Sequence, residues 1–407
     1  MDDAPDTTEM NQQTRPPELA ALIKSADDAM ARGDARAARD GFTRVTSLAP
    51  GLLEPWLGLA ACQRALGDLG GALRAVQGAL TVDPRCFPAL LMKGSLLEAA
   101  GDAKPAAIAY GIALKVAPKT EALAEPMRRA IARATQAHDA YIAQLAESLK
   151  AAVGVQVGAH STAESQRVET FIEVIAGRRK IYPQEPVQFH YPGMPTIEFY
   201  DRDPFPWLVE LEARTDEIRA EALAVWRDRT DDLVPYVDYP DGLPLDQWEE
   251  LNRSLDWSAF HLFRDGKPVE ENCRQCPVTA EAIKLIDQPR VPGRSPAAMF
   301  SILKPRTRIP PHTGIANTRL VLHLPLVVPE GCGFRVGGET RKWREGDAWV
   351  FDDTIEHEAW NDSDLPRTIL ICDVWSPSLS ANERELIAHL MGEFDRFNGM
   401  QTARADL

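Results

Sequence analysis

The sequence contains Pro311-His312-Thr313-Gly314 and, further along the same stretch, Phe351-Asp352-Asp353-Thr354-Ile355-Glu356-His357. Arg367 follows ten residues after His357. Short apolar or alternating segments, separated by Gly, Pro and Asp turns, surround both motifs and are typical of a barrel or sandwich of β-strands. The strands that we predict span 258–263, 298–303, 318–328, 334–336, 340–343, 348–351, 356–360 and 367–375.

Two histidines differ from the others in their surroundings. His312 lies between two prolines and Gly314 at a predicted strand start, a position at the mouth of the β-domain. His357 follows an acidic turn and opens the next strand. Five further histidines have ordinary helical, linker or strand contexts and are interpreted as surface or structural residues: His138, His160, His190, His261 and His389.

A mononuclear iron site is the hypothesis that these two histidines suggest. Neutral imidazole binds Fe(II) well, and oxygen chemistry needs coordination positions left open for O2 and a co-substrate. The common arrangement adds a carboxylate two residues after the first histidine, where this sequence has Gly314. On the residues alone two alternatives stay open: water in the third place, or a carboxylate from elsewhere, for which Asp352 and Asp353 are the candidates.

Arg367 meets a second requirement of such chemistry, which is a cationic group to bind the co-substrate. A 2-oxoglutarate bound to iron through its keto-acid end leaves its distal carboxylate pointing into the β-domain, where an arginine pairs with it best in bidentate geometry. The strand that follows His357 is a suitable place for that arginine. The pattern therefore predicts Fe(II) with 2-oxoglutarate as co-substrate.

Together these pieces resemble the aspartyl/asparaginyl β-hydroxylase family of Fe(II)- and 2-oxoglutarate-dependent oxygenases. The resemblance covers about residues 188–390, and only the combination of motifs is specific. Besides the two opening motifs it rests on Asn317-Thr318-Arg319-Leu320, His323-Leu324, Glu356-His357-Glu358, Arg367 and Asp373-Val374-Trp375.

The resemblance implies a double-stranded β-helix fold (jelly-roll or cupin-like) and iron held by two histidines without a carboxylate. It thus accounts for Gly314 and decides against Asp352 and Asp353 as ligands; we interpret these as turn residues and hydrogen-bond acceptors. It also implies roles for the remaining residues. The metal ligands and catalytic residues are His312 and His357, Arg367 with Ser301 holds the distal carboxylate, and His323 lies near the keto-acid end.

One position departs from the family pattern. Animal members have an arginine two residues before the position of His323, where this chain has Val321. Arg319 alternates onto the same face of the strand, so it either replaces that contact to 2-oxoglutarate or faces the substrate.

An internal repeat precedes the β-domain. Pro50, Pro84 and Pro118 lie 34 residues apart, and the Gly-Asp pairs that begin at Gly33 and Gly67 keep the same period, as does a third pair at 101. This is the period of tetratricopeptide repeats, which stack helix pairs. We predict an α+β multidomain chain: a disordered lead over 1–18, an all-α repeat solenoid with a capping helix over 19–152, a linker over 153–180 and the β-domain over 181–400.

Composition limits the location and partners. The formal charge of −15 argues against nucleic acid or an anionic membrane as a partner, and no apolar run approaches a membrane span. The first twenty residues lack the features of a signal peptide, and six scattered cysteines form no disulfide framework, so we expect a cytoplasmic protein.

Three functions follow as hypotheses. The leading one is β-hydroxylation of an aspartyl or asparaginyl residue in a peptide or protein held partly by the repeats, with release of succinate and CO2. The second is hydroxylation of a free amino acid or an acyl chain. The third is a repeat-based binding protein whose β-domain is not catalytic.

Overall fold

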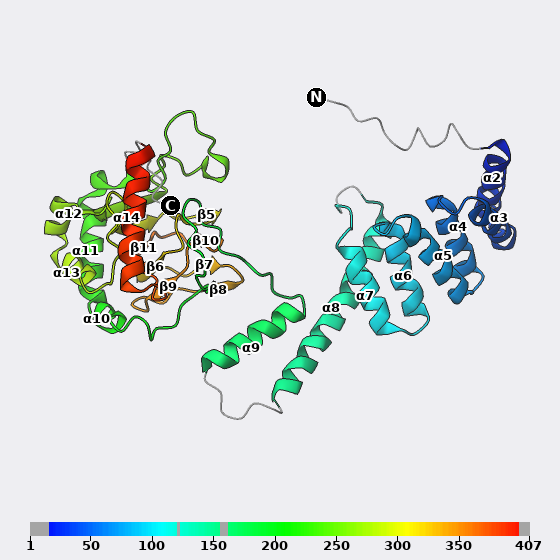
Figure 1. The fold of residues 1–407 in the computed structure, drawn as a ribbon, viewed down its shortest axis with the longest axis horizontal. Helices are drawn as coiled ribbons and strands as arrows, with labels where there is room; N and C mark the ends of the chain where they lie inside the picture. The colour runs from blue at the N-terminus through cyan, green and yellow to red at the C-terminus, as the bar shows by residue number, and fades with distance from the viewer. Residues whose placement is uncertain (1–15, 120–122, 155–161, 399–407) are drawn as a thin grey trace. The chain divides into compact units, whose positions relative to one another are not determined.

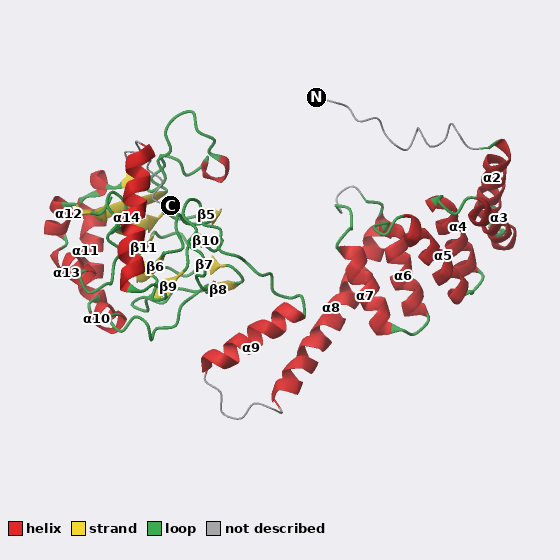
Figure 2. Ribbon diagram, in the orientation of Figure 1, coloured by secondary structure: helices red, strands yellow, loops and turns green. Residues whose placement is uncertain are grey.

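The structure is a computed structural model, and it describes residues 16–119, 123–154 and 162–398 (Figure 1). The chain divides into two compact units, Met1–Arg179 and Lys180–Leu407. The first unit is helical, whereas the second combines strands with helices (Figure 2). Each unit has a hydrophobic core of its own.

Over its described residues the first unit contains three helix pairs followed by two further helices, which confirms the repeat. The first two pairs are α2 (Pro17–Ala31) with α3 (Ala35–Leu48) and α4 (Leu53–Ala65) with α5 (Leu69–Val82). The third pair and the helices after it are α6 (Phe87–Ala99), α7 (Ala103–Leu114), α8 (Glu125–Gly154) and α9 (Thr162–Ile175).

The Gly-Asp pairs form the turn inside each helix pair. Gly33 and Gly67 have φ angles of +78° and +79°, the left-handed conformation that ends a helix and that glycine adopts without strain. The next residue caps the second helix: the carboxylates of Asp34 and Asp68 accept hydrogen bonds from the amides of Ala37 (3.1 Å) and Gly71 (2.8 Å). The 34-residue period is therefore a period of helix stops and starts.

Two predictions about the boundaries of the first unit need correction. Helix α2 begins at Pro17, before the expected start at residue 19, because a proline at the first helical position loses no hydrogen bond; residues 1–15 of the predicted lead lie outside the described residues. The expected linker contains helix α9, whose Ile172 packs with Ala176 and with Ala146 of α8. Its apolar stripe is too narrow to stand out in the sequence.

The second unit is built on two antiparallel sheets. The larger follows the order β1-β2-β4-β11-β6-β9, with β3 paired to β2, and the smaller follows β5-β10-β7-β8. The strands of the larger sheet are β1 (Val234–Pro235), β2 (Trp257–Arg264), β3 (Lys267–Pro268), β4 (Ala298–Leu303), β6 (Arg319–Val327), β9 (Trp349–Phe351) and β11 (Arg367–Trp375). Those of the smaller sheet are β5 (Thr307–His312), β7 (Cys332–Val336), β8 (Glu339–Arg341) and β10 (His357–Asn361).

Helices cover the larger sheet on one face, and the site lies on the other. Leucines of β6 pack with helix residues such as Ile218 and Ile283 into an apolar layer. The covering helices are α10 (Leu208–Ala213), α11 (Thr215–Asp228), α12 (Glu270–Gln275) and α13 (Pro277–Ile283). Toward the smaller sheet, an aromatic cluster around Phe334 and Phe351 fills part of the space. Two short 3-10 helices, η2 (Thr230–Asp232) and η3 (Asp246–Trp248), and the last helix α14 (Ala381–Asn398) complete the unit.

The sequence analysis predicted no strand over residues 307–312, where the structure has β5, and it therefore placed His312 at the wrong end of a strand. The histidine ends β5 instead of starting a strand. Pro310 and Pro311 cannot donate ladder hydrogen bonds, so the sequence reads against a strand there. Since β5 is the edge strand of the smaller sheet, paired only with β10, the prolines are tolerated.

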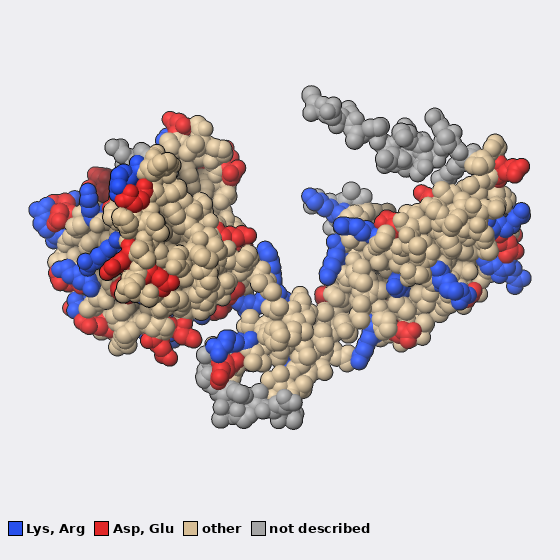
Figure 3. All heavy atoms as spheres, viewed as in Figure 1, with Lys and Arg blue, Asp and Glu red and all other residues tan. Residues whose placement is uncertain are grey.

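The surface carries charges of both signs. Lys and Arg side chains are interspersed with Asp and Glu side chains over the visible face of the second unit (Figure 3). Across the described ranges, no helix combines the length and apolar character needed to cross a membrane.

Candidate active site

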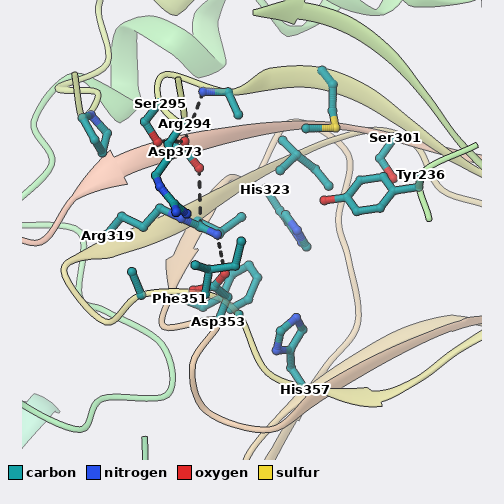
Figure 4. A pocket seen from close by; sticks show the side chains of 18 of the residues that line it. Tyr236, Arg294, Ser295, Ser301, Arg319, His323, Phe351, Asp353, His357 and Asp373 are labelled. Carbon is teal, nitrogen blue, oxygen red and sulfur yellow. Dashed lines mark hydrogen bonds and ion pairs between the residues drawn. The ribbon is translucent and has the colours of Figure 1, made fainter. Parts of the chain in front are cut away.

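The site is a pocket between the two sheets of the second unit (Figure 4). Because successive side chains of a strand alternate between faces, every second residue of three neighbouring strands faces the same space. The lining residues are Met299 and Ser301 of β4, Arg319, Val321 and His323 of β6, and Arg367, Ile369, Ile371, Asp373 and Trp375 of β11. The smaller sheet contributes Ile309, His312, Phe334, His357 and Ala359.

His312 and His357 meet as a cross-strand pair. They are directly opposite in the β5–β10 ladder, and their ring centroids are 4.0 Å apart. The Nδ1 atom of His312 lies 2.7 Å from the carbonyl oxygen of Pro310, and that of His357 lies 3.1 Å from the carbonyl oxygen of Ile355. A carbonyl only accepts, so both Nδ1 atoms carry the proton, and Nε2 of each ring keeps its lone pair for a metal.

Burial keeps the pocket histidines neutral. It lowers the pKa of His312 to about 4, and it lowers the pKa of His357 well below the ordinary value, with the neighbouring His312 adding to the effect. The pKa of His323 is also well below 6.5, first because of burial and then because of Arg367. A neutral imidazole is the form that binds a metal.

These lowered pKa values predict that the metal-free second unit loses stability in acid. Unfolded histidines take up protons below about pH 6.5, whereas His312 stays neutral to about pH 4 and burial lowers the pKa values of His323 and His357 in the same direction. Stability present above pH 6.5 is therefore lost as the pH falls. His261 contributes in the same way, since burial lowers its pKa to about 4. Asp353 has the opposite effect on stability. Burial raises its pKa to about 7 against the effect of Arg319, so between pH 6 and pH 5 the folded state binds about one more proton at this residue than the unfolded state does.

We therefore expect the unfolding free energy to fall by about 2 to 3 kcal/mol between pH 6 and pH 5. Denaturant unfolding followed by tryptophan fluorescence measures this, because eight of the nine tryptophans lie beyond residue 180. His261→Phe should reduce the fall by about 1 kcal/mol, since it removes one titrating group outside the pocket. An unfolding free energy equal at both pH values would contradict this electrostatic description.

Arg367 is a buried cation that forms no ion pair with a carboxylate among the residues the structure describes. It is 1% exposed, its Nη2 lies 3.4 Å from Ser301 Oγ, and its Nε has no hydrogen-bond partner. Burial lowers the pKa of this arginine to about 10. The indole N–H of Trp257 donates to Ser301 Oγ at 3.0 Å, which leaves the hydroxyl proton of Ser301 for another acceptor. A buried guanidinium in this state is costly unless an anion joins it.

His323 lies between the aromatic rings of Phe334 and Phe351. Their ring centroids are 4.9 Å and 4.7 Å from that of His323, and its Nδ1 has no hydrogen-bond partner. In Figure 4 the side chains of Tyr236, His323 and His357 point toward the same space. Among the described residues this buried nitrogen is thus left without a partner.

Arg319 lies away from Arg367 and is already paired. Arg319 faces Trp375 at the end of β11 opposite to Arg367. Its guanidinium forms ion pairs with Asp353 (3.0 Å) and Asp373 (3.4 Å). Arg319 and Arg367 therefore line opposite ends of the pocket wall that β6 and β11 form.

Gly314 makes room for the carboxylate of Asp353. A Cβ atom at position 314 would lie 2.0 Å from Asp353 Oδ2. Asp352 instead accepts hydrogen bonds from the amide (2.9 Å) and hydroxyl (2.6 Å) of Thr354. Over the parts of the chain that the structure describes, no three His, Cys, Asp or Glu side chains are grouped to hold a metal ion.

Gly314→Ala should destabilise the second unit by about 1 to 3 kcal/mol, because Asp353 is buried, paired and has nowhere to move. The penalty should shrink when the same substitution is made in an Asp353→Ala background. Denaturant unfolding of the two single variants and the double variant measures this coupling. If Gly314→Ala destabilised the wild type and the Asp353→Ala variant equally, the contact with Asp353 would not be the reason for glycine at position 314.

Other residues of the pocket were missed by sequence reasoning. Tyr236 stacks on Trp257 with ring centroids 3.8 Å apart, and both line the pocket. Asp373 was noted only as part of a motif, although the two-residue period of its strand places it on the face of Arg367. That period is a signal the sequence contains, whereas nothing local indicates Tyr236.

Comparisons with known proteins relate the second unit to hydroxylases. Residues 212–377 match the profile of the family described as aspartyl/asparaginyl beta-hydroxylase. The chain is 37% identical over 180 residues to the aspartyl/asparaginyl beta-hydroxylase of Mus musculus, which covers 44% of this chain and 24% of the mouse protein. It is 34% identical over 196 residues to the ornithine lipid ester-linked acyl 2-hydroxylase of Rhizobium tropici. This match covers 47% of this chain and 66% of the Rhizobium protein.

The second unit therefore contains a hydroxylase-type domain. Residues 212–377 of this unit form a domain of the aspartyl/asparaginyl β-hydroxylase family. The chain spans about a quarter of the length of the mouse and human proteins that it matches. Among solved structures, this chain is similar to the Sgt2 TPR domain from Aspergillus fumigatus. The match covers 37% of this chain and 92% of that domain, with 22% sequence identity and a TM-score of 0.27.

Proposed function

We propose that the second unit is an Fe(II)- and 2-oxoglutarate-dependent oxygenase that hydroxylates a C–H bond. The observation that carries this proposal is the presence, in one pocket, of two histidines with free Nε2 atoms and a buried arginine without a carboxylate. The first feature suits a metal and the second suits the distal carboxylate of a dicarboxylate. The double-stranded β-helix assignment is part of the same proposal.

The residues present fit the metal. His312 and His357 are neutral, held in one tautomer by backbone carbonyls, and adjacent across two strands. Gly314 leaves that side of the site without a third protein ligand. Fe(II) bound there would supply the oxygen chemistry, in which 2-oxoglutarate, O2 and R–H yield succinate, CO2 and R–OH.

The residues also fit the co-substrate. Arg367 with the hydroxyl of Ser301 would hold the distal carboxylate, which would neutralise the buried guanidinium. The orphaned Nδ1 of His323 is suited to donate toward the keto-acid end when it carries the proton. The aromatic rings of Phe334 and Phe351 keep water away from this part of the pocket.

The substrate that we favour is an aspartyl or asparaginyl residue of a peptide or protein, hydroxylated at its β-carbon. The support is the family of the second unit and the polar group of Arg319, Asp353 and Asp373 on the wall of the pocket. Because Arg319 already pairs with both carboxylates, the substrate must compete with or join an existing ion-pair network.

A second candidate substrate is an acyl chain. Phe189, Ile315, Trp375 and Met391 give part of the pocket wall an apolar character. The similarity to an acyl 2-hydroxylase from Rhizobium tropici supports the same possibility. Hydroxylation of a free amino acid is the remaining enzymatic alternative.

We further propose that the helical repeats hold a peptide or protein partner and that the protein acts in the cytoplasm. Support for the first point is the exposed surface that stacked helix pairs provide. Deletion of residues 1–179 tests it: the KM for a peptide substrate should rise, while the KM for 2-oxoglutarate should not change. Equal peptide KM values would assign the repeats another role.

Succinate formation from 2-oxoglutarate by the purified protein, with Fe(II) and ascorbate, tests the proposed function. Mass spectrometry of a host lysate with and without the active enzyme then identifies the substrate as the species that gains one oxygen. Absence of succinate under these conditions, with the metal shown to be bound, would favour the non-catalytic alternative.

A further inference from the structure

A strap over residues 184–191 joins the two loops that flank the histidines. One loop follows His312 and covers 313–318, and the other precedes His357 and covers 352–356. The strap lies before residue 212, where the family match begins. Its contacts are therefore a feature that the family profile does not describe.

Backbone hydrogen bonds attach the strap to both loops. The amide of Glu185 donates to the carbonyl of Thr354 at 2.7 Å, in the loop before His357. The amides of Val187 and Phe189 donate to the carbonyls of Gly314 (2.8 Å) and Ile315 (2.9 Å), in the loop after His312. The strap thus crosses both loops in one continuous run of chain.

The side chain of Gln184 bridges the same two loops. Its amide nitrogen donates to the carboxylate of Asp352, and its amide oxygen accepts from Asn317 Nδ2 at 3.1 Å. Asp352 is fully buried and Asn317 is 1% exposed. Asn317 is held further by the amide and carbonyl of Tyr191, at 2.7 Å and 3.0 Å. A buried polar network in which each member is satisfied fixes positions strongly.

The loops in turn fix the histidine rings. Asp352 shapes the turn that ends at Ile355, and the carbonyl of Ile355 accepts from His357 Nδ1 at 3.1 Å. The amide of Gly314 donates to the carbonyl of Asp353 at 2.7 Å, so the two loops also contact each other. A shift of either loop would change the separation of the two Nε2 atoms.

We propose that the strap, acting through Gln184, is the positioning element of the two-histidine site. With only two protein ligands, metal affinity depends strongly on holding both rings at the correct separation. Gln184 is not among the residues that line the pocket, so it would act through the two loops. This inference rests on the proposed function, in that it assumes that His312 and His357 bind the metal.

Gln184→Met tests it in the full chain, because methionine has a similar volume and cannot bridge Asp352 to Asn317. Binding of Mn(II), followed by electron paramagnetic resonance of the free ion, should weaken by about 10- to 100-fold. Gln188→Ala is the matched control: its side chain accepts from Arg294 at 2.9 Å, while its backbone amide still bonds Ile315. It should retain wild-type Mn(II) affinity.

A folded Gln184→Met variant with Mn(II) affinity within twofold of the wild type would overturn the proposal. Thermal unfolding without metal shows whether the variant is folded. If it is not, Gln184→Glu takes its place: it keeps the acceptor for Asn317 and loses the donor to Asp352, and the same weakening is expected. Failure of the wild-type chain to bind Mn(II) would instead reject the metal site itself.

Discussion

His357→Ala is expected to abolish metal binding and succinate formation. Two histidines are the protein ligands in this account, so loss of one leaves a single imidazole, which cannot hold Fe(II) or Mn(II) at micromolar concentration. Mn(II) titration and succinate assay measure the two effects. His312→Ala should behave in the same way because the two rings are equivalent partners in one cross-strand pair.

The matched control for both variants is His389→Ala. His389 lies on α14 with a side chain 70% exposed, and its nearest charged partner is Glu393 at 3.9 Å. It should keep wild-type metal affinity and turnover. Metal affinity in His357→Ala equal to that of the control would show that the metal, if any, binds elsewhere.

Arg367→Met is expected to raise the KM for 2-oxoglutarate by about 10²- to 10³-fold. Loss of a buried, charge-assisted pair costs about 3 to 4 kcal/mol, and each 1.4 kcal/mol is a factor of ten. The same variant should be at least as stable as the wild type without ligand, because it removes a buried charge that has no carboxylate partner. Its metal affinity should not change.

Thermal unfolding with and without 2-oxoglutarate separates these effects. The wild type should gain stability from 2-oxoglutarate, and Arg367→Met should not. Arg306→Met is the control, since that side chain is 65% exposed and pairs with the exposed Asp364. A normal KM in Arg367→Met would mean that another cation holds the distal carboxylate.

The architecture was predictable where the sequence contains a repeat or an alternation of apolar and polar residues. The Gly-Asp pairs specify both the end of one helix and the cap of the next, so the 34-residue period survives in the sequence. The strands 298–303 and 367–375 were predicted to the residue, because both are buried on two faces and bounded by turns. Strand β5 was not, since its prolines are acceptable only at a sheet edge, and edge position depends on partners far away in the sequence.

The site was predictable to a similar extent. The structure brings His312 next to His357, and Ser301 next to Arg367, as the motifs suggested. It separates Arg319 from Arg367 and pairs it with Asp353 and Asp373, which only the register of β6 on β11 determines. The strap was unpredictable because the spacing between Gln184 and Asn317 carries no pattern; their contact exists only once both loops are folded.

Turnover under ¹⁸O2 tests the central claim most directly. The purified protein, loaded with Fe(II) and given 2-oxoglutarate in unlabelled water, should form succinate that carries one ¹⁸O atom, and His357→Ala should form none. Succinate without ¹⁸O, or labelled succinate formed equally by His357→Ala, would contradict an oxygenase centred on His312, His357 and Arg367.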